Sequence, residues 1–209
     1  MSSFDVLRGG RSERERMEAA LDGRGLIAER ELGSADVLLA QAAKSDPRAF
    51  EELYERYYAR VYRYVYHRVG HEKDAEDITA VVFMKMLEAL PTYRARQGLF
   101  APWLFRIARN AVVDHYRRKR QHGPLEDLHD DSGSSDPLAR ALGNERREEL
   151  YLLVQHLSTD QKEVVLMRFA GDLSFPEIAE TLKKTEPAVR MILHRALRKL
   201  KEVMTHDPR

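Results

Sequence analysis

The sequence predicts an all-α protein with two helical domains joined by a flexible acidic linker. Apolar residues recur at spacings of three and four through most of residues 36–204, and no segment shows the alternation with period two that marks a strand. Helix-capping residues stand directly before several of these periodic segments. The periodicity stops at residues 122–137, which are rich in Asp, Ser, Gly and Pro and therefore predict the linker.

The bulk composition narrows the class of protein. A chain of 209 residues, 43% of them hydrophobic, is long enough for one or two compact cores. It has no run of about 18 apolar residues, so we expect no membrane insertion, and its first residues lack the apolar stretch of a secretion signal. The absence of cysteine excludes disulfides, cysteine-ligated zinc and thiol catalysis, and it fits a cytoplasmic location.

The charges are sorted along the chain, although the net charge is only +1. Residues 106–120 carry six Arg or Lys side chains against one acid, whereas residues 123–137 carry five acids and no base. The positive charge is therefore concentrated in modules on either side of an acidic joint, and a low net charge does not exclude nucleic-acid binding.

The first domain is expected at residues 36–121, after a polar, glycine-rich extension (residues 1–35) that can be disordered. Its first helix is indicated by Val37, Leu38 and Ala42. Asp46 and Pro47 should begin the second helix in the N-cap and N1 roles, and Gly70 should end it. The core face of this second helix is predicted to comprise Phe50, Leu53, Tyr54, Tyr57, Val61, Tyr64 and Val65.

Two further helices complete this domain. The third should run from about residue 72 to Pro91, with an acidic first turn that suits the helix dipole. Its inward residues are expected to be Ala75, Ile78, Val82, Met86 and Leu90. The fourth, primed by Pro102, should bury Leu104, Ile107, Ala108, Ala111 and Val112 and leave Arg106, Arg109, Asn110, Val113 and Arg117 toward solvent or a partner.

The second domain is expected at residues 138–204, with a tail at residues 205–209. After a helix near residues 138–157, capping boxes should open two helices, one at Ser158 with Gln161 and one at Ser174 with Glu177. Lys183 and Lys184 occupy a tight turn, and Thr185 with Pro187 begins the last helix. Two short helices, a tight turn and a basic second helix are typical of a helix-turn-helix.

The last helix has two different faces. One is predicted to hold Val189, Ile192, Leu193, Ala196, Leu197 and Leu200, and the opposite one Arg190, Met191, His194, Arg195 and Arg198. A purely aliphatic face against a cationic one favours DNA binding. A helical hairpin with a solvated basic face is the alternative that the pattern alone leaves open.

Three ordered stretches resemble the extracytoplasmic-function (ECF, group 4) class of sigma-70 factors. DAEDITAVVFMKMLEAL resembles region 2.2 of that family, PWLFRIARNAVVDHYRRKR its regions 2.3 and 2.4, and residues 157–200 its region 4. The resemblance implies a sigma factor that directs promoter recognition and DNA opening by RNA polymerase. It implies no catalytic residue, cofactor or metal.

The resemblance also implies where partners bind. Core RNA polymerase is expected through its beta-prime clamp and beta flap, with an anti-sigma factor as a further partner, and the clamp contacts fall on Asp74, Glu76, Asp77 and Lys85. Ala80 and Val81 depart from the polar and acidic residues usual at their positions. Thr79, beside them, is a hypothetical phosphorylation site that would restore negative charge.

Promoter DNA is the second implied partner. For the minus-10 element, Asn110 is expected to read a base, Arg106, Arg109, Arg117 and Arg118 to hold phosphates, and a loop with Tyr93, Arg94, Arg96, Gln97 and Phe100 to form a base pocket. Trp103 is either a stacking platform or a buried anchor. For the minus-35 element, the implied residues are Arg190, Met191, His194 and Arg195, with Thr185, Glu186 and Lys199 near the backbone.

Some readings stay open. The acidic linker either imitates nucleic acid in a polymerase channel or is a solvated tether. A stand-alone regulator that binds duplex DNA would use the same helix-turn-helix. An enzyme is disfavoured: Gly70 separates His67 from His71 and removes the helical spacing that would place both on one metal, and Asp114 beside His115 is a weak sign of acid-base chemistry.

Overall fold

The computed structural model of the chain describes residues 35–94, 99–122 and 151–206. These ranges are helical apart from short turns, and none of them contains a strand, which confirms the all-α class. The helices are α3 (Pro47–Val69), α4 (Glu72–Ala89), α5 (Phe100–His122), α7 (Thr159–Phe169), α8 (Phe175–Leu182) and α9 (Glu186–His206), with a 3₁₀ turn at Leu90–Thr92. Residues 35–42 and 151–155 are also helical.

Several predictions fall outside the described residues. They concern the N-terminal extension, the acidic linker, most of the helix expected near residues 138–157, and the two loop residues Arg96 and Gln97. No helix within the described ranges combines the length and the hydropathy needed to cross a membrane.

Local sequence signals set the helix ends as predicted. The Asp46 side chain accepts from the backbone N–H of Arg48 at 2.9 Å, and Gly70 ends α3 in the left-handed conformation with φ of 75°. Both capping boxes are present, at Ser158 with Gln161 and at Ser174 with Glu177. Each of these caps satisfies backbone groups that a helix end leaves without an intrahelical partner.

The helix predicted from Val37, Leu38 and Ala42 is present at residues 35–42, and its buried face carries a carboxylate. Leu38 is 67% exposed, whereas Asp36 and Ala40 are buried. Asp36 accepts hydrogen bonds from the Tyr57 hydroxyl and from Arg56, so this face of the helix turns toward α3. A buried carboxylate needs such partners, and the spacing of apolar residues does not reveal them.

The core of the N-terminal bundle (residues 35–94 and 99–122) otherwise follows the predicted pattern. Every inward residue expected on α4 is buried, and so are Leu104, Ala108, Ala111 and Val112 on α5. Tyr54 is an exception at 39% exposed, because it packs at the edge against Phe83 with ring centroids 4.7 Å apart. Phe105 was not predicted to be buried, yet it is fully buried.

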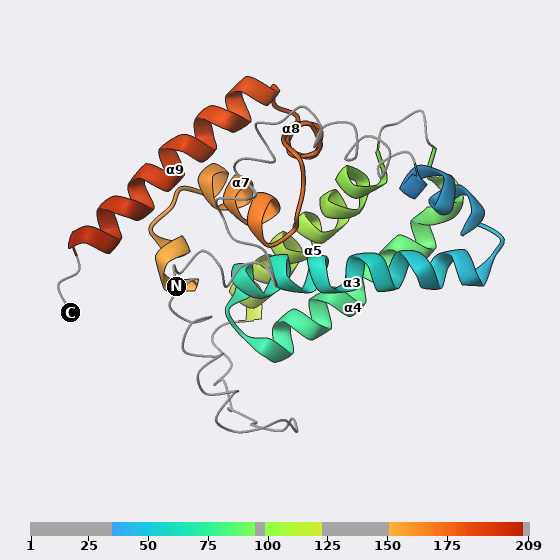
Figure 1. The fold of residues 1–209 in the computed structure, drawn as a ribbon. Coiled ribbons are helices and arrows are strands. Elements are labelled where there is room, and N and C mark those ends of the chain that lie inside the picture. Colours follow the sequence, from blue (N-terminus) through green and yellow to red (C-terminus); the bar gives the residue numbers. More distant parts are fainter. Residues whose placement is uncertain (1–34, 95–98, 123–150, 207–209) are drawn as a thin grey trace, which may run out of the picture.

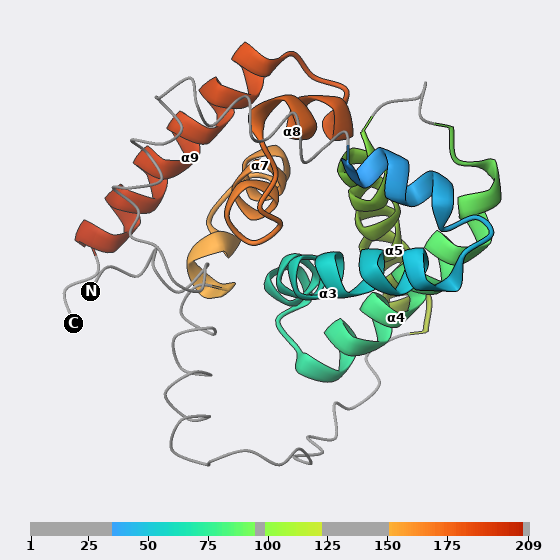
Figure 2. The ribbon, with the colours of Figure 1, turned by 45° about the vertical axis from the view of Figure 1, so that its right-hand side comes forward.

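The C-terminal bundle (residues 151–206) packs directly on the N-terminal bundle. Helix α8 contacts α5, α7 contacts α3, and α7 and α8 lie between α9 and the N-terminal bundle (Figures 1 and 2). The Phe105 ring of α5 comes so close to Gly171 that a Cβ at that glycine would lie 2.6 Å from it. We call this packing of the two bundles the closed arrangement.

Candidate nucleic-acid interface

The basic face of α9 is open to solvent. Arg190, Met191, His194 and Arg195 are all exposed, whereas Val189, Leu193, Ala196 and Leu200 of the opposite face are buried. Thr185 accepts from the backbone N–H of Ala188 at 3.4 Å and so caps the helix. The predicted residues Glu186 and Lys199 lie along the same helix, so every residue expected at the minus-35 element belongs to α9 or its cap.

Arg190 is held by an ion pair and by an aromatic ring. Its Nη2 and Nε donate to Glu186 Oε1 at 2.6 and 3.0 Å, and its guanidinium lies 4.0 Å from the centroid of the Phe175 ring. A guanidinium held by an ion pair and an aromatic ring loses less rotamer freedom when it binds a planar acceptor. The first turn of α9 therefore presents a preorganised donor.

The basic face of α5 is partly covered by the C-terminal bundle. Arg106 Nη1 lies 3.7 Å from Glu180 Oε1, and Arg109 Nε lies 3.4 Å from Glu163 Oε1. Asn110 and Arg117 remain exposed, and Arg117 pairs with Asp114 at 3.2 Å. Two of the cations expected to hold minus-10 phosphates thus face carboxylates of the other bundle.

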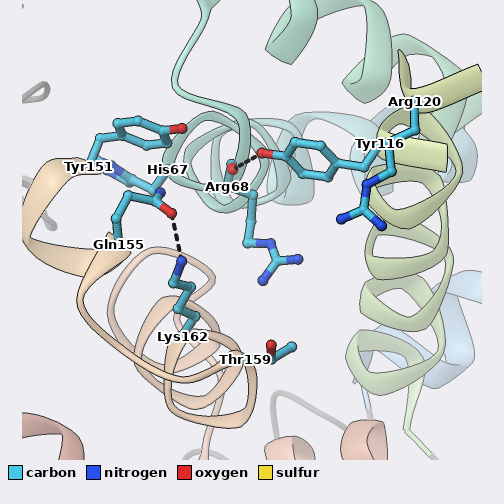
Figure 3. A pocket seen from close by; sticks show the side chains of 8 residues that line it. All are labelled: His67, Arg68, Tyr116, Arg120, Tyr151, Gln155, Thr159 and Lys162. Atoms are coloured by element: carbon cyan, nitrogen blue, oxygen red, sulfur yellow. Dashed lines mark hydrogen bonds between the residues drawn. The ribbon is translucent and has the colours of Figure 1, made fainter. Parts of the chain in front are cut away.

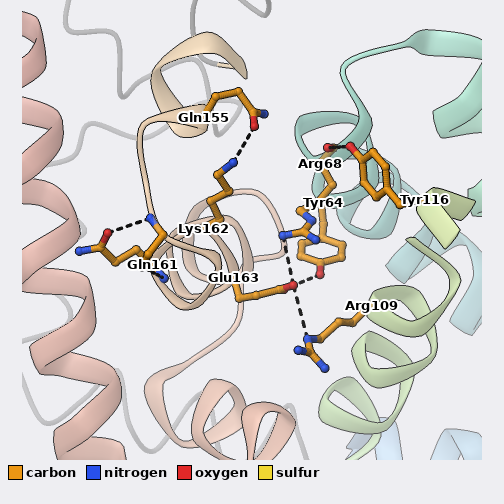
Figure 4. Close-up of polar contacts among 9 residues, drawn as sticks. Tyr64, Arg68, Arg109, Tyr116, Gln155, Gln161, Lys162 and Glu163 are labelled. Atoms are coloured by element: carbon orange, nitrogen blue, oxygen red, sulfur yellow. Dashed lines mark hydrogen bonds and ion pairs between the residues drawn. The ribbon is translucent and has the colours of Figure 1, made fainter. Parts of the chain in front are cut away.

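Glu163 lies at the centre of this contact (Figure 4). Its side chain is only 2% exposed. Oε2 accepts from the Tyr64 hydroxyl at 2.7 Å, and Oε1 lies 3.2 Å from Arg68 and 3.4 Å from Arg109, ion-pair distances without hydrogen-bond geometry. Burial raises the pKa of Tyr64 well above its ordinary value, and the charge of Glu163 acts in the same direction.

Arginines of α3 bind the end of α7 beside this cluster. Arg60 donates to the carbonyl oxygens of Gly171 and Asp172 at 2.9 and 3.0 Å, and Arg63 donates to that of Ala170 at 3.2 Å. Cations are favourable at a helix C-terminus, where backbone carbonyls lack intrahelical donors. The closed arrangement is therefore held by backbone carbonyls as well as by Glu163.

Two residues expected in the minus-10 base pocket are part of the core. Tyr93 is 1% and Phe100 0% exposed, and their rings pack edge-on with centroids 5.8 Å apart. Burial, followed by the charge of Glu180, raises the pKa of Tyr93 to about 12. Both rings are buried among core residues in this arrangement, so the base pocket expected to include them is not formed by exposed rings here. Trp103 packs 5.0 Å from Tyr93, which favours the anchor interpretation.

The solvent-exposed face of α4 carries both acidic and apolar side chains. Glu76 and Asp77 are exposed, whereas Asp74 lies 3.6 Å from His115 and Lys85 lies 3.5 Å from Asp114, both on α5. Met84 and Leu87, which the sequence did not single out, are 63% and 54% exposed beside them. Two exposed apolar side chains are ordinary on a protein surface, so the docking of α4 on core polymerase stays a prediction.

The proposed phosphorylation of Thr79 does not fit the structure. Thr79 is 0% exposed on the inner side of α4, and its hydroxyl has no hydrogen-bond partner among the described residues. A kinase cannot reach this hydroxyl in the folded helix bundle. Ala80, in contrast, is exposed, so the unusual residue itself lies on the surface of α4.

Comparisons with known proteins agree on one family. Family models described as Sigma-70 region 2 and Sigma-70, region 4 match residues 53–122 and 147–200. The chain is 35% identical over 176 residues to the ECF RNA polymerase sigma factor BldN of Streptomyces coelicolor, covering 81% of this chain but only 65% of that protein. It is 32% identical to the ECF RNA polymerase sigma factor SigD of Mycobacterium tuberculosis, covering 80% of this chain and 82% of that protein.

A solved structure is also similar. CnrH, solved in complex with the cytosolic domain of CnrY, matches with a TM-score of 0.64 and 27% sequence identity over 83% of this chain and 99% of that one.

Proposed function

The chain belongs to the ECF class of the sigma-70 family, the RNA polymerase sigma factors of transcription initiation, and from this premise we propose how its helices divide the task. Helix α9 reads the minus-35 element as duplex, α5 contacts the minus-10 element through Asn110 and its arginines, and α4 docks on core polymerase. The protein acts by binding alone, without catalysis, in the cytoplasm where polymerase and promoter DNA are present.

The observation that carries this proposal is the composition of the exposed face of α9. Arg190 and Arg195 are donors suited to the O6 and N7 acceptors of guanine, and Met191, 52% exposed, suits the methyl group of thymine. The buried opposite face fixes the helix on α7 and α8, as a recognition helix requires.

The closed arrangement adds a step to this function. Arg106 and Arg109 lie 3.7 and 3.4 Å from Glu180 and Glu163, so these carboxylates of the other bundle compete with phosphates for the two guanidinium groups. We therefore propose that the bundles separate when the protein engages core polymerase and the promoter. The complex of CnrH with the cytosolic domain of CnrY supports a related proposal, that a regulatory protein of the anti-sigma kind also binds this chain.

In vitro transcription tests the proposal. Genomic fragments are transcribed with bacterial core polymerase, with and without the protein, and the start sites are mapped. Discrete new transcripts with shared upstream elements are the expected result. DNA binding without any new transcript would favour the stand-alone regulator, because that protein needs neither α4 nor the exposed Asn110.

A further inference from the structure

A cavity of about 310 Å³ lies where the two bundles meet (Figure 3). Arg68, Tyr116 and Arg120 line it from the N-terminal bundle, and Tyr151, Gln155 and Lys162 line it from the C-terminal bundle. The volume is at the lower end of the range for small-molecule sites, about 300 to 1,000 Å³. Because its lining comes from both bundles, the cavity exists only in the closed arrangement.

The described residues of the lining carry positive charge. Arg68, Arg120 and Lys162 are cations, and none of the lining residues that the structure describes is an acid. The carboxylate that faces Arg68 is Glu163, but Glu163 is shared with Arg109, so one negative charge serves two buried or half-buried positive charges. An anion in the cavity would balance this excess.

The excess positive charge affects two of the lining cations, Lys162 and Arg68. Partial burial and the positive charge of Arg68 both lower the pKa of Lys162, whose Nζ donates to Gln155 at 2.6 Å. The Arg68 side chain is only 11% exposed, and its Nε is buried without a hydrogen-bond partner among the described residues. The Arg68 guanidinium is thus incompletely hydrogen-bonded among the described residues, which is unfavourable for a buried cation.

Aromatic rings form other parts of the wall. The Tyr116 hydroxyl donates to the Arg68 carbonyl oxygen at 2.6 Å, which fixes this ring beside the cation. The Tyr151 ring lies against Gly70, where a Cβ would come within 2.6 Å of it. The cavity thus offers apolar ring surface next to its cations, which suits an organic phosphate as well as an inorganic one.

We propose that this cavity binds a small molecule with two or more phosphate groups, such as inorganic pyrophosphate or a nucleoside diphosphate. Arginine matches phosphate oxygens through paired donors, and lysine adds a compact charge. Three cations call for a ligand with more than one negative charge, and a volume of about 310 Å³ suits a small molecule. Because the ligand contacts both bundles, its binding stabilises the closed arrangement.

Whether a stabilised closed arrangement slows transcription rests on the proposed function, in which the bundles separate at the promoter, but ligand binding itself does not. Isothermal titration calorimetry of the full chain with sodium pyrophosphate therefore needs no polymerase. Lys162→Gln with Arg120→Gln removes two of the lining cations without touching Glu163 or its partners. Arg48→Gln with Lys73→Gln is the matched control, since it removes the same charge from exposed positions outside the cavity.

We expect pyrophosphate to bind the wild-type chain, with affinity about tenfold weaker for each lining cation removed and nearly unchanged in the control. Equal weakening in both double variants would overturn the proposal, because it would mean diffuse attraction to surface charge. No binding to the wild-type chain at millimolar pyrophosphate would overturn it as well.

Two further titrations identify the source of the phosphates. A nucleoside diphosphate that binds more tightly than pyrophosphate, and loses affinity in the Lys162 and Arg120 variant, supports a ligand whose base packs on the tyrosines. Equal affinities support recognition of the phosphates alone. A single-stranded oligonucleotide that outcompetes both probes at this site would overturn the small-molecule assignment in favour of a nucleic-acid backbone.

Discussion

The basic faces of α9 and α5 carry similar side chains in different surroundings. On α9, Arg190 and Arg195 are exposed, and the carboxylate that orders Arg190 comes from its own helix. On α5, Arg106 and Arg109 face carboxylates from the other bundle. The difference teaches that the closed arrangement leaves the duplex-reading helix available and covers part of the helix expected to contact the minus-10 element.

Glu163 specifies how the two bundles pack but adds little to the free energy of unfolding. Two arginines and a tyrosine converge on one buried carboxylate, and the desolvation of such a group offsets most of its attraction. A buried ion pair is therefore weak evidence for added stability. Removing only one partner is strongly unfavourable, because the other charge stays buried without compensation. The cluster therefore favours the one packing in which Glu163 meets all its partners.

Glu163→Leu should have the largest effect, because it should expose the basic face of α5 as fully as that of α9. Removing one partner of a buried ion pair costs about 3 to 5 kcal/mol, because Arg68 and Arg109 lose their carboxylate. We expect the bundles to separate, with a larger radius of gyration in small-angle scattering and unchanged helical circular dichroism. Asp160→Leu is the control, since it removes an exposed carboxylate of the same helix whose ion-pair partner, Lys184, belongs to the same bundle. An unchanged radius in the Glu163 variant would refute the role of this carboxylate.

Arg190→Ala and Arg195→Ala test the open face. Each should lose about 1 to 3 kcal/mol of discrimination at a base pair of the minus-35 element, since a bidentate contact to guanine is removed. Transcription from promoters with single base changes measures this loss, and binding to core polymerase should be unaffected. Arg48→Ala, which removes an exposed arginine of α3, serves as control. Unaltered promoter preference in both variants would show that α9 does not read bases.

Asn110→Ala probes the part of α5 that stays exposed. Loss of one side-chain hydrogen bond to an extruded base should weaken promoter opening by about 0.5 to 1.5 kcal/mol and leave polymerase assembly intact. Permanganate footprinting of the minus-10 element measures opening, and Val113→Ala, on the same helix, is the control. Wild-type footprints from the Asn110 variant would argue against base reading by this residue.

Glu180→Gln should have the smallest effect. Arg106 and Glu180 are each 31% exposed in their side chains, and exposed pairs contribute about 0.2 to 1 kcal/mol. We expect a slight separation of the bundles that disappears at high salt, where the pair is screened in the parent protein too. If Glu180→Gln separated the bundles as much as Glu163→Leu does, the contact of Glu180 with Arg106 would be the main one that holds them together.

Local features were predictable from the sequence because neighbouring residues decide them. Asp46, Gly70, Ser158 and Ser174 act on backbone groups within four residues, and the structure has each cap where the pattern placed it. The two faces of α9 follow from helical periodicity in the same way.

Contacts between distant residues were not predictable. Glu163 lies in a run of apolar neighbours on the buried face of α7, a signal that a carboxylate would be buried, but its partners are 54 to 99 positions away. Tyr93 and Phe105 show the same limit. Tyr93 is buried beside Phe100 and Trp103, and Phe105, for which no burial was predicted, packs against Gly171 of the second bundle. The cavity between the bundles has no sequence signature at all.

The most direct test of the account is the distance between the bundles with and without core polymerase. The chain has no cysteine, so Glu55→Cys on α3 and Glu202→Cys on α9 can carry the only two spin labels. Pulsed dipolar spectroscopy should give one narrow distance distribution for the free protein and a longer distance once polymerase is bound. The same narrow distribution in both samples would contradict the claim that Arg106 and Arg109 must leave Glu180 and Glu163 for transcription to begin.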